Sequence, residues 1–221
     1  MTENTAPTLI TRENANTFDK FIPLALRTES PNGQLYTDVT AFVAAISAAI
    51  ASAEILDGFK KQMFYGKTEK LLTKTQHYVR ILEDATSVLN QGINLGEQQP
   101  IPLNHRVLHG LLGFVTEAGE LAAVLKKGTE GEEVDAVNIQ EEVSDAAWYV
   151  AIINDELKLD FYQGLTNVVN KLIVRYPEKF DSFFADNRNL DAERAQLEAN
   201  LNVSGVILVD GNMPDPYKNR V

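Results

Sequence analysis

The sequence predicts an all-α protein, and three observations lead to this fold class. Apolar residues recur at spacings of three and four along most of the 221-residue chain, which is the period of an amphipathic helix. Runs that alternate between apolar and polar residues, which would indicate strands, are few. Glycine and proline, which interrupt helices, gather in short stretches such as residues 28–34 and 92–104. We therefore expect a bundle of helices joined by short turns.

The first 91 residues contain three expected helices. A first helix over residues 14–27 includes Pro23, which must kink or delimit it. A long alanine-rich helix over residues 38–65 ends near Gly66, and another helix covers residues 69–91.

Two helices expected in the second half of the chain carry paired acidic residues. The first covers residues 105–127, ends at Gly128 and has two lysines in its last turn, where the helix dipole favours cations. The second is expected to open at Asn138, because Glu141 three positions later would complete a capping box. Glu141 would then have a structural role, and Glu142 beside it would have none.

Two more helices follow. Asp160 can cap a helix that runs to Arg175 and is stopped by the Tyr-Pro pair after it. A last amphipathic helix is expected near residues 189–200. The stretch "VSGVILVDG" (203–211) then predicts one short strand.

Composition and charge exclude several classes of function. The chain has no cysteine, so disulfides, zinc-thiolate sites and thiol nucleophiles are excluded. Its net charge of −11 repels phosphate backbones, and we expect no nucleic-acid partner. The start has neither a basic region nor an apolar one typical of a secretory signal, and the apolar run at 41–53 is too short to cross a bilayer before Glu54. We expect a cytoplasmic protein without a membrane partner.

Two pairs of carboxylates, Glu117 with Glu120 and Glu142 with Asp145, are the candidate functional residues. Each pair is spaced by three, so its members project side by side from one helix. If the two helices are antiparallel neighbours, the four carboxylates repel one another unless a proton or a cation neutralises them. Oxygen-only ligands suit Mg²⁺ or Mn²⁺. The competing interpretation is that both pairs are solvated surfaces pointing away from each other.

Small residues on the first of these helices support a close helix pair. Gly113, Ala118 and Gly119 would let a neighbouring helix approach. A di-iron carboxylate site is the obvious competitor for the acidic residues, but it requires Glu-x-x-His motifs, and none occurs. His109 is therefore interpreted as polar surface or as support for the ligands. Trp148, the single tryptophan, is either a core residue or a platform for a nucleotide base.

An acidic pair with the same spacing, Glu54 and Asp57, precedes paired lysines in the long alanine-rich helix. Two explanations remain open, a chance match and an ancient duplication. The predicted organisation is accordingly an N-terminal helix and turn, an additional helical region with its linker that is either unrelated or a degenerate repeat, a core, and a C-terminal helix with its tail. These parts cover residues 1–34, 35–104, 105–184 and 185–221.

Three blocks of sequence, taken in order, resemble the MazG-like branch of the all-α nucleoside triphosphate pyrophosphohydrolases. They are "HGLLGFVTEAGEL", "NIQEEVSDAAWYV" and "NKLIVRYPEKF", within residues 105–184. A weaker resemblance lies in "FDKFIPLALRTES" (18–30), which is similar to the leading segment of phage and bacterial relatives. The family often has a further glutamate just before the first acidic pair, whereas this chain has Thr116.

The resemblance implies a helical bundle of that family's type and a hydrolase that cuts a nucleoside triphosphate or deoxynucleoside triphosphate into the monophosphate and pyrophosphate. It implies Mg²⁺, with Mn²⁺ as a substitute, bound by the four carboxylates, and a homo-oligomer, dimer or tetramer. It further assigns phosphate contacts to Lys171 and Arg175, which lie one turn apart; Asn167 on the same side would orient the phosphates or face water. The alternative is a helical nucleotide-binding or interaction module without turnover.

Overall fold

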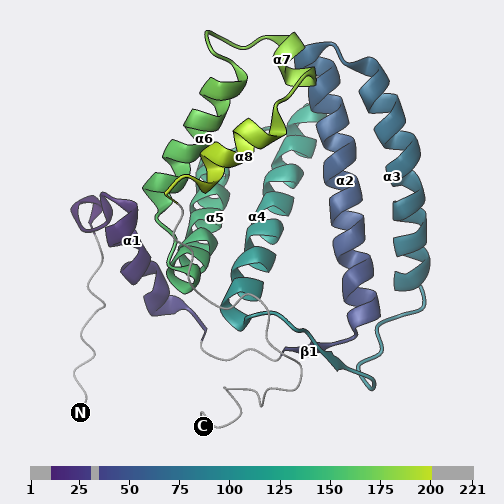
Figure 1. Cartoon of the computed structure of the whole chain (residues 1–221). Coiled ribbons are helices and arrows are strands. Elements are labelled where there is room, and N and C mark those ends of the chain that lie inside the picture. The colour runs from purple at the N-terminus through teal and green to yellow at the C-terminus, as the bar shows by residue number, and fades with distance from the viewer. Residues whose placement is uncertain (1–10, 31–34, 201–221) are drawn as a thin grey trace, which may run out of the picture. The chain divides into compact units, whose positions relative to one another are not determined.

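The computed structural model describes residues 11–30 and 35–200, and it confirms the all-α class (Figure 1). Within the described residues the helices pack as pairs. The α-helices are α1 (Phe18–Ala25), α2 (Val39–Tyr65), α3 (Thr68–Leu89), α4 (His105–Thr129), α5 (Ala136–Leu157), α6 (Phe161–Arg175), α7 (Ser182–Asp186) and α8 (Leu190–Glu198). The chain divides into two compact units, one formed by Met1–Gly33 with Leu103–Val221 and the other by Gln34–Pro102.

The second unit is a helical hairpin of α2 and α3. The side chain of Asp38 caps α2 by accepting the N–H of Ala41 at 3.0 Å. The helix ends at Gly66, as the sequence predicts, and this glycine has the left-handed conformation, φ +66°. Gly58 allows α3 to pack closely, because a Cβ atom there would be 3.2 Å from Leu71 Cα. The two-residue strands β1 (Tyr36–Thr37) and β2 (Gln99–Pro100), which the sequence did not predict, pair antiparallel at the open end of this hairpin.

The acidic pair of α2 is neutralised within the hairpin. Lys74 of α3 places its ammonium group against both Glu54 and Asp57, at 2.8 Å from Asp57 Oδ2. Lys60 and Lys61 also contact Asp57. Partial burial would raise the pKa of Asp57, but the hydrogen bonds from the three lysines outweigh it and hold that pKa well below its ordinary value. These carboxylates therefore need no dissolved cation.

In the first unit, α4 and α5 pack against each other as a second hairpin (Figure 1). Helix α5 begins at Ala136, because the side chain of Asp135 accepts the N–H of Val137 at 2.8 Å and caps it. The expectation that Asn138 is the cap of this helix is therefore wrong by three residues. Glu141 lies inside the helix with an exposed side chain and has no role in a capping box.

Helices α6 and α8 form a further pair in this unit, and the cap predicted for α6 is confirmed. Asp160 accepts the N–H of Gln163 at 2.8 Å at the start of α6, and Asn189 accepts the N–H of Ala192 at 3.0 Å at the start of α8. The strand predicted for residues 203–211 lies outside the described residues.

The amino-terminal helix is shorter than the sequence predicts. Residues 14–27 divide into the end of a 3-10 helix, Arg12–Ala15, then α1, and then a second 3-10 helix, Leu26–Thr28. Pro23 lies inside α1 and does not end it. At its start, the ring of Phe18 stacks on the ring of Phe161 with centroids 4.0 Å apart, which fixes α1 to the start of α6.

Helices α2 and α4 are long and apolar enough to cross a membrane, judged by length and composition alone, with mean hydropathies of 2.0 and 1.3 over their best windows. The core helices of soluble proteins pass the same test. The apolar segment of α2 is longer than the run of residues 41–53 suggests, because the helix continues through Glu54 to Tyr65. The absence of a membrane partner stays a prediction.

Candidate metal centre

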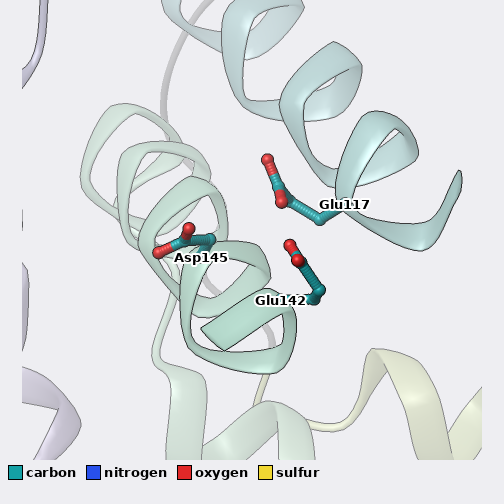
Figure 2. Close-up of side chains that lie close together, drawn as sticks. All are labelled: Glu117, Glu142 and Asp145. Atoms are coloured by element: carbon teal, nitrogen blue, oxygen red, sulfur yellow. The ribbon is translucent and has the colours of Figure 1, made fainter. Parts of the chain in front are cut away.

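Three of the four predicted carboxylates meet between α4 and α5 (Figure 2). Glu117 extends from α4, and Glu142 and Asp145 extend from α5. One carboxylate oxygen of each residue lies within 4.8 Å of those of the other two. Glu117 is buried, with 8% of its surface exposed, Glu142 is half-buried and Asp145 is exposed. The cluster therefore has a buried floor and an open side.

The close approach of the two helices depends on glycine in α4. A Cβ atom at Gly113 would be 2.0 Å from Cε1 of Tyr149, and one at Gly110 would be 3.1 Å from the main-chain oxygen of Tyr149. Because Gly113 lies one turn before Glu117, the same contact presses that carboxylate against α5. Gly119, which was also expected to admit a neighbouring helix, faces open space.

Glu120 lies outside this group of three, which we call the carboxylate triad. Its side chain is exposed. It is still close enough for its charge to act on Glu142, whose pKa lies above its ordinary value. The causes of that shift are partial burial first, then the charge of Glu120, and then the hydrogen bond and charge of Glu117. The structure thus brings three of the predicted ligands together and leaves the fourth at the edge.

The phenol of Tyr149 experiences the same negative field. Burial raises the pKa of Tyr149 above its ordinary value, and the charges of Glu117, Asp145 and Glu120 add to this effect. A raised pKa for both a carboxyl and a phenol shows that added negative charge is disfavoured here. Burial, the first cause of both shifts, disfavours charge of either sign, but the part that comes from the neighbouring carboxylates is a negative field, which favours a cation.

An aromatic cluster adjoins the carboxylate triad. The ring of Trp148 meets the rings of His109 and Tyr149 edge to face, with centroids 5.9 and 4.9 Å apart. The indole N–H donates to the main-chain oxygen of Ala25 at 2.9 Å and to the hydroxyl of Thr28 at 3.2 Å. These bonds hold the amino-terminal segment against α5 and support the core interpretation of Trp148 over the base platform. His109 belongs to this cluster and not to the triad.

The residues of α6 assigned to phosphate have other partners. Asn167 is almost fully buried, and its amide donates to the main-chain oxygens of Leu197 and Ala199 at 3.2 and 2.8 Å. Arg175 forms an ion pair with Glu193 of α8. Lys171 is half-buried and makes no ion pair with any residue that the structure describes. Of the three, only Lys171 has an ammonium or guanidinium group left for a substrate.

One charged cluster was missed by reasoning from the sequence. Arg106, at the start of α4, binds both carboxylate oxygens of Glu29 at 2.8 Å, and its other amino group binds Asp155 and Glu156 at 2.6 and 2.9 Å. The hydrogen bonds that Arg106 donates to Glu29 above all raise the pKa of Arg106. Glu29 stands 77 residues from Arg106 in the chain, and no local spacing connects the two.

The donor set of the triad fits Mg²⁺ or Mn²⁺. It consists of carboxylate oxygens held by two helices, and such ions prefer oxygen ligands, keep several waters and use only a few carboxylates. The exposed side at Asp145 leaves room for those waters or for a substrate. Compared with known proteins, the chain matches no family model, no curated sequence and no solved structure.

Proposed function

We propose that the protein is a Mg²⁺-dependent nucleoside triphosphate pyrophosphohydrolase of the MazG-like type. The observation that carries this proposal is the meeting of Glu117, Glu142 and Asp145 across two helices, with oxygens within 4.8 Å of one another. The resemblance of three sequence blocks to that family supports it, because two of the blocks supply these residues. The electrostatics support it as well, since the charges of Glu120 and Glu117, after burial, contribute to the raised pKa of Glu142, and a cation is favoured beside such grouped carboxylates.

The reaction breaks the bond between the α-phosphorus and the oxygen that bridges it to the β-phosphorus. A water oxygen forms the new bond to phosphorus, the water's proton leaves, and pyrophosphate is released with the bridging oxygen. A Mg²⁺ ion, when bound, polarises phosphoryl oxygens and lowers the pKa of a bound water. Glu117, Glu142 and Asp145 would hold that ion, and Glu120 at the open edge would accept the proton.

The test is release of pyrophosphate from a panel of canonical and modified nucleoside triphosphates, with Mg²⁺, with Mn²⁺ and with a chelator. Wild type is compared with Glu117→Gln and Asp145→Asn. We expect pyrophosphate release only when metal is present. Each variant should lose about 100-fold or more of this activity, because it lacks one carboxylate that would hold the metal, and the metal stabilises the charge that develops on the phosphate in the transition state. Glu83→Gln, an exposed glutamate of α3, is the matched control and should behave as wild type.

A folded wild type that releases no pyrophosphate from any triphosphate would overturn the proposal. Metal-dependent nucleotide binding without release would identify the protein as a binding module instead. Circular dichroism and thermal unfolding of each variant separate lost chemistry from lost folding.

We also propose, from the resemblance, that the protein is cytoplasmic and forms a homo-oligomer. Exposed apolar side chains on α4 support association, among them Leu111 at 49% and Val115 at 52% exposure. Light scattering at several protein concentrations measures the oligomeric state, and a monomer throughout would contradict this part of the proposal.

A further inference from the structure

A short segment after α1 is fixed at several points. The indole of Trp148 binds the oxygen of Ala25 and the hydroxyl of Thr28, and that hydroxyl also donates to the same oxygen at 3.0 Å. One residue further on, Glu29 binds Arg106 through two hydrogen bonds of 2.8 Å. The segment on both sides of Arg27 is therefore held to α5 and α4, before it through the main-chain oxygen of Ala25 and after it through the side chains of Thr28 and Glu29.

Arg27 itself is exposed. It makes no hydrogen bond or ion pair with any residue that the structure describes, although it lies between residues that do. Other arginines of this unit have carboxylate partners: Arg106 binds Glu29, and Arg175 binds Glu193. A guanidinium on a fixed main chain loses less conformational freedom on binding a ligand than a guanidinium on a mobile loop.

This segment is linked to the carboxylate triad through two rings. Trp148, which holds the segment, lies one turn after Asp145 on α5, and helical side chains lean toward the amino-terminal end, here toward Asp145. Its ring also meets the ring of Tyr149, whose pKa is raised by burial and by the charges of Glu117, Asp145 and Glu120. The segment is thus held to α5 through Trp148, one turn after Asp145.

We propose that Arg27 binds the polyphosphate of the substrate. This inference rests on the proposed function and deepens it. A metal bound by the triad offsets part of a triphosphate's charge, and a second cation is needed on the substrate's other side. Guanidinium suits that task because its planar donors match two phosphate oxygens at once. Arg175, which the sequence suggested for it, is occupied by Glu193.

Trp148 and Arg106 act in this scheme as positioning residues. Neither needs to touch the substrate. Trp148→Phe would keep most of the ring contacts and remove both bonds of the indole N–H to the segment. The variant is therefore expected to weaken polyphosphate binding while leaving metal binding alone unchanged.

The experiment measures binding of inorganic tripolyphosphate by calorimetry in the presence of Mn²⁺, with binding of Mn²⁺ alone as a separate measurement. Arg27→Gln should weaken tripolyphosphate binding by about tenfold or more, because charge-assisted hydrogen bonds are lost, and should leave Mn²⁺ binding unchanged. Arg27→Lys should restore part of the loss. Arg80→Gln, an exposed arginine of α3 without a carboxylate partner among the described residues, is the matched control.

The outcomes separate this inference from the proposed function. Tripolyphosphate binding that Arg27→Gln does not change, or no binding by folded wild type with Mn²⁺ present, would overturn the inference. Weaker binding in Arg27→Gln, in a protein that hydrolyses no triphosphate, would overturn the function and keep the inference. If Arg27→Gln hydrolysed a triphosphate with an unchanged KM, the proposed function would stand and the inference about Arg27 would be overturned.

Discussion

The ring of Tyr149 lies against the main chain of Gly113, so closely that a Cβ atom on the glycine would be 2.0 Å from the ring carbon Cε1. No side chain larger than hydrogen fits without moving the ring. This contact sets the distance between α4 and α5, and with it the geometry of the carboxylate triad.

Gly113→Ala is expected to destabilise the protein by about 1–3 kcal/mol, the usual cost of overpacking a close contact. It should also weaken binding of Mn²⁺, because Glu117 lies one turn further along α4. Thermal unfolding and calorimetry measure the two effects. Gly119→Ala on the same helix is the control: nothing lies within 4 Å of its Cβ position, so alanine should stabilise α4 by about 1 kcal/mol. Equal changes in stability and in Mn²⁺ binding for the two alanine variants would contradict the close contact between Gly113 and Tyr149.

Glu142→Gln is expected to raise the melting temperature of the metal-free protein at pH 7. Partial burial and the charges of Glu120 and Glu117 raise the pKa of Glu142 in the folded state. A raised carboxyl pKa means that the unfolded chain releases this proton first, so stability falls as pH rises between the unfolded and folded values. Below about pH 4, the ordinary pKa of glutamate, the variant and wild type should therefore be equally stable.

Glu83→Gln is the matched control for this experiment, since it removes the same charge from an exposed glutamate of α3, whereas the charge of Glu141 itself helps to raise the pKa of Glu142. With saturating Mg²⁺ the order should reverse, and Glu142→Gln should be the less stable protein. If Glu142→Gln lowered the melting temperature of the metal-free protein at pH 7, the ionised carboxylate of Glu142 would not destabilise the folded protein.

Glu193→Gln is expected to cost about 2 kcal/mol at pH 7, because Glu193 is buried and accepts charge-assisted hydrogen bonds from two arginines. Bonds from Arg175, then from Arg188, lower the pKa of Glu193 to about 2. Its contribution is present above the unfolded value of about 4.3 and is lost as pH falls toward 2. Chemical unfolding at pH 7 and pH 3 should show a smaller difference at the lower pH. Glu198→Gln, at an exposed ion pair with Arg194, should change little.

Arg106→Met is expected to destabilise the protein by about 3 kcal/mol, since it leaves partly buried acidic residues without their shared cation. Because Glu29 loses its partner, the amino-terminal segment should also become more accessible to protease near Arg27. Trypsin cleavage at that site, faster in Arg106→Met than in wild type, is the measurement. An unchanged cleavage rate would show that Trp148 alone fixes the segment.

Short-range patterns in the sequence were sufficient to predict much of the fold. The cap at Asp160 was predicted because a cap involves only the next few residues. The start of α5 was misplaced because Asp135 and Asn138 are both suitable caps, and the acidic loop before the helix does not distinguish between them. The strand pair β1–β2 joins residues more than 60 positions apart, which no local pattern reports.

The candidate site, like the fold, was predictable only where it depends on residues close together in the chain. Spacing by three placed Glu117 with Glu120 on one side of a helix, but which of them faces α5 depends on where the helices touch. That contact is fixed by Gly113 and Tyr149, 36 positions apart in the numbering. The engagement of Arg175 by Glu193 likewise depends on how α8 folds back on α6.

The α2–α3 hairpin, in which Lys74 neutralises the carboxylates, can serve as a metal-independent reference for the α4–α5 hairpin of the same chain. Lys74 stands six residues after the start of α3, as Glu142 stands six residues after the start of α5. One hairpin thus carries an ammonium group where the other carries a carboxylate. In hydrogen–deuterium exchange, a chelator should speed amide exchange in residues 105–157 and leave exchange in residues 39–89 unchanged. The second region is therefore a control within the same measurement.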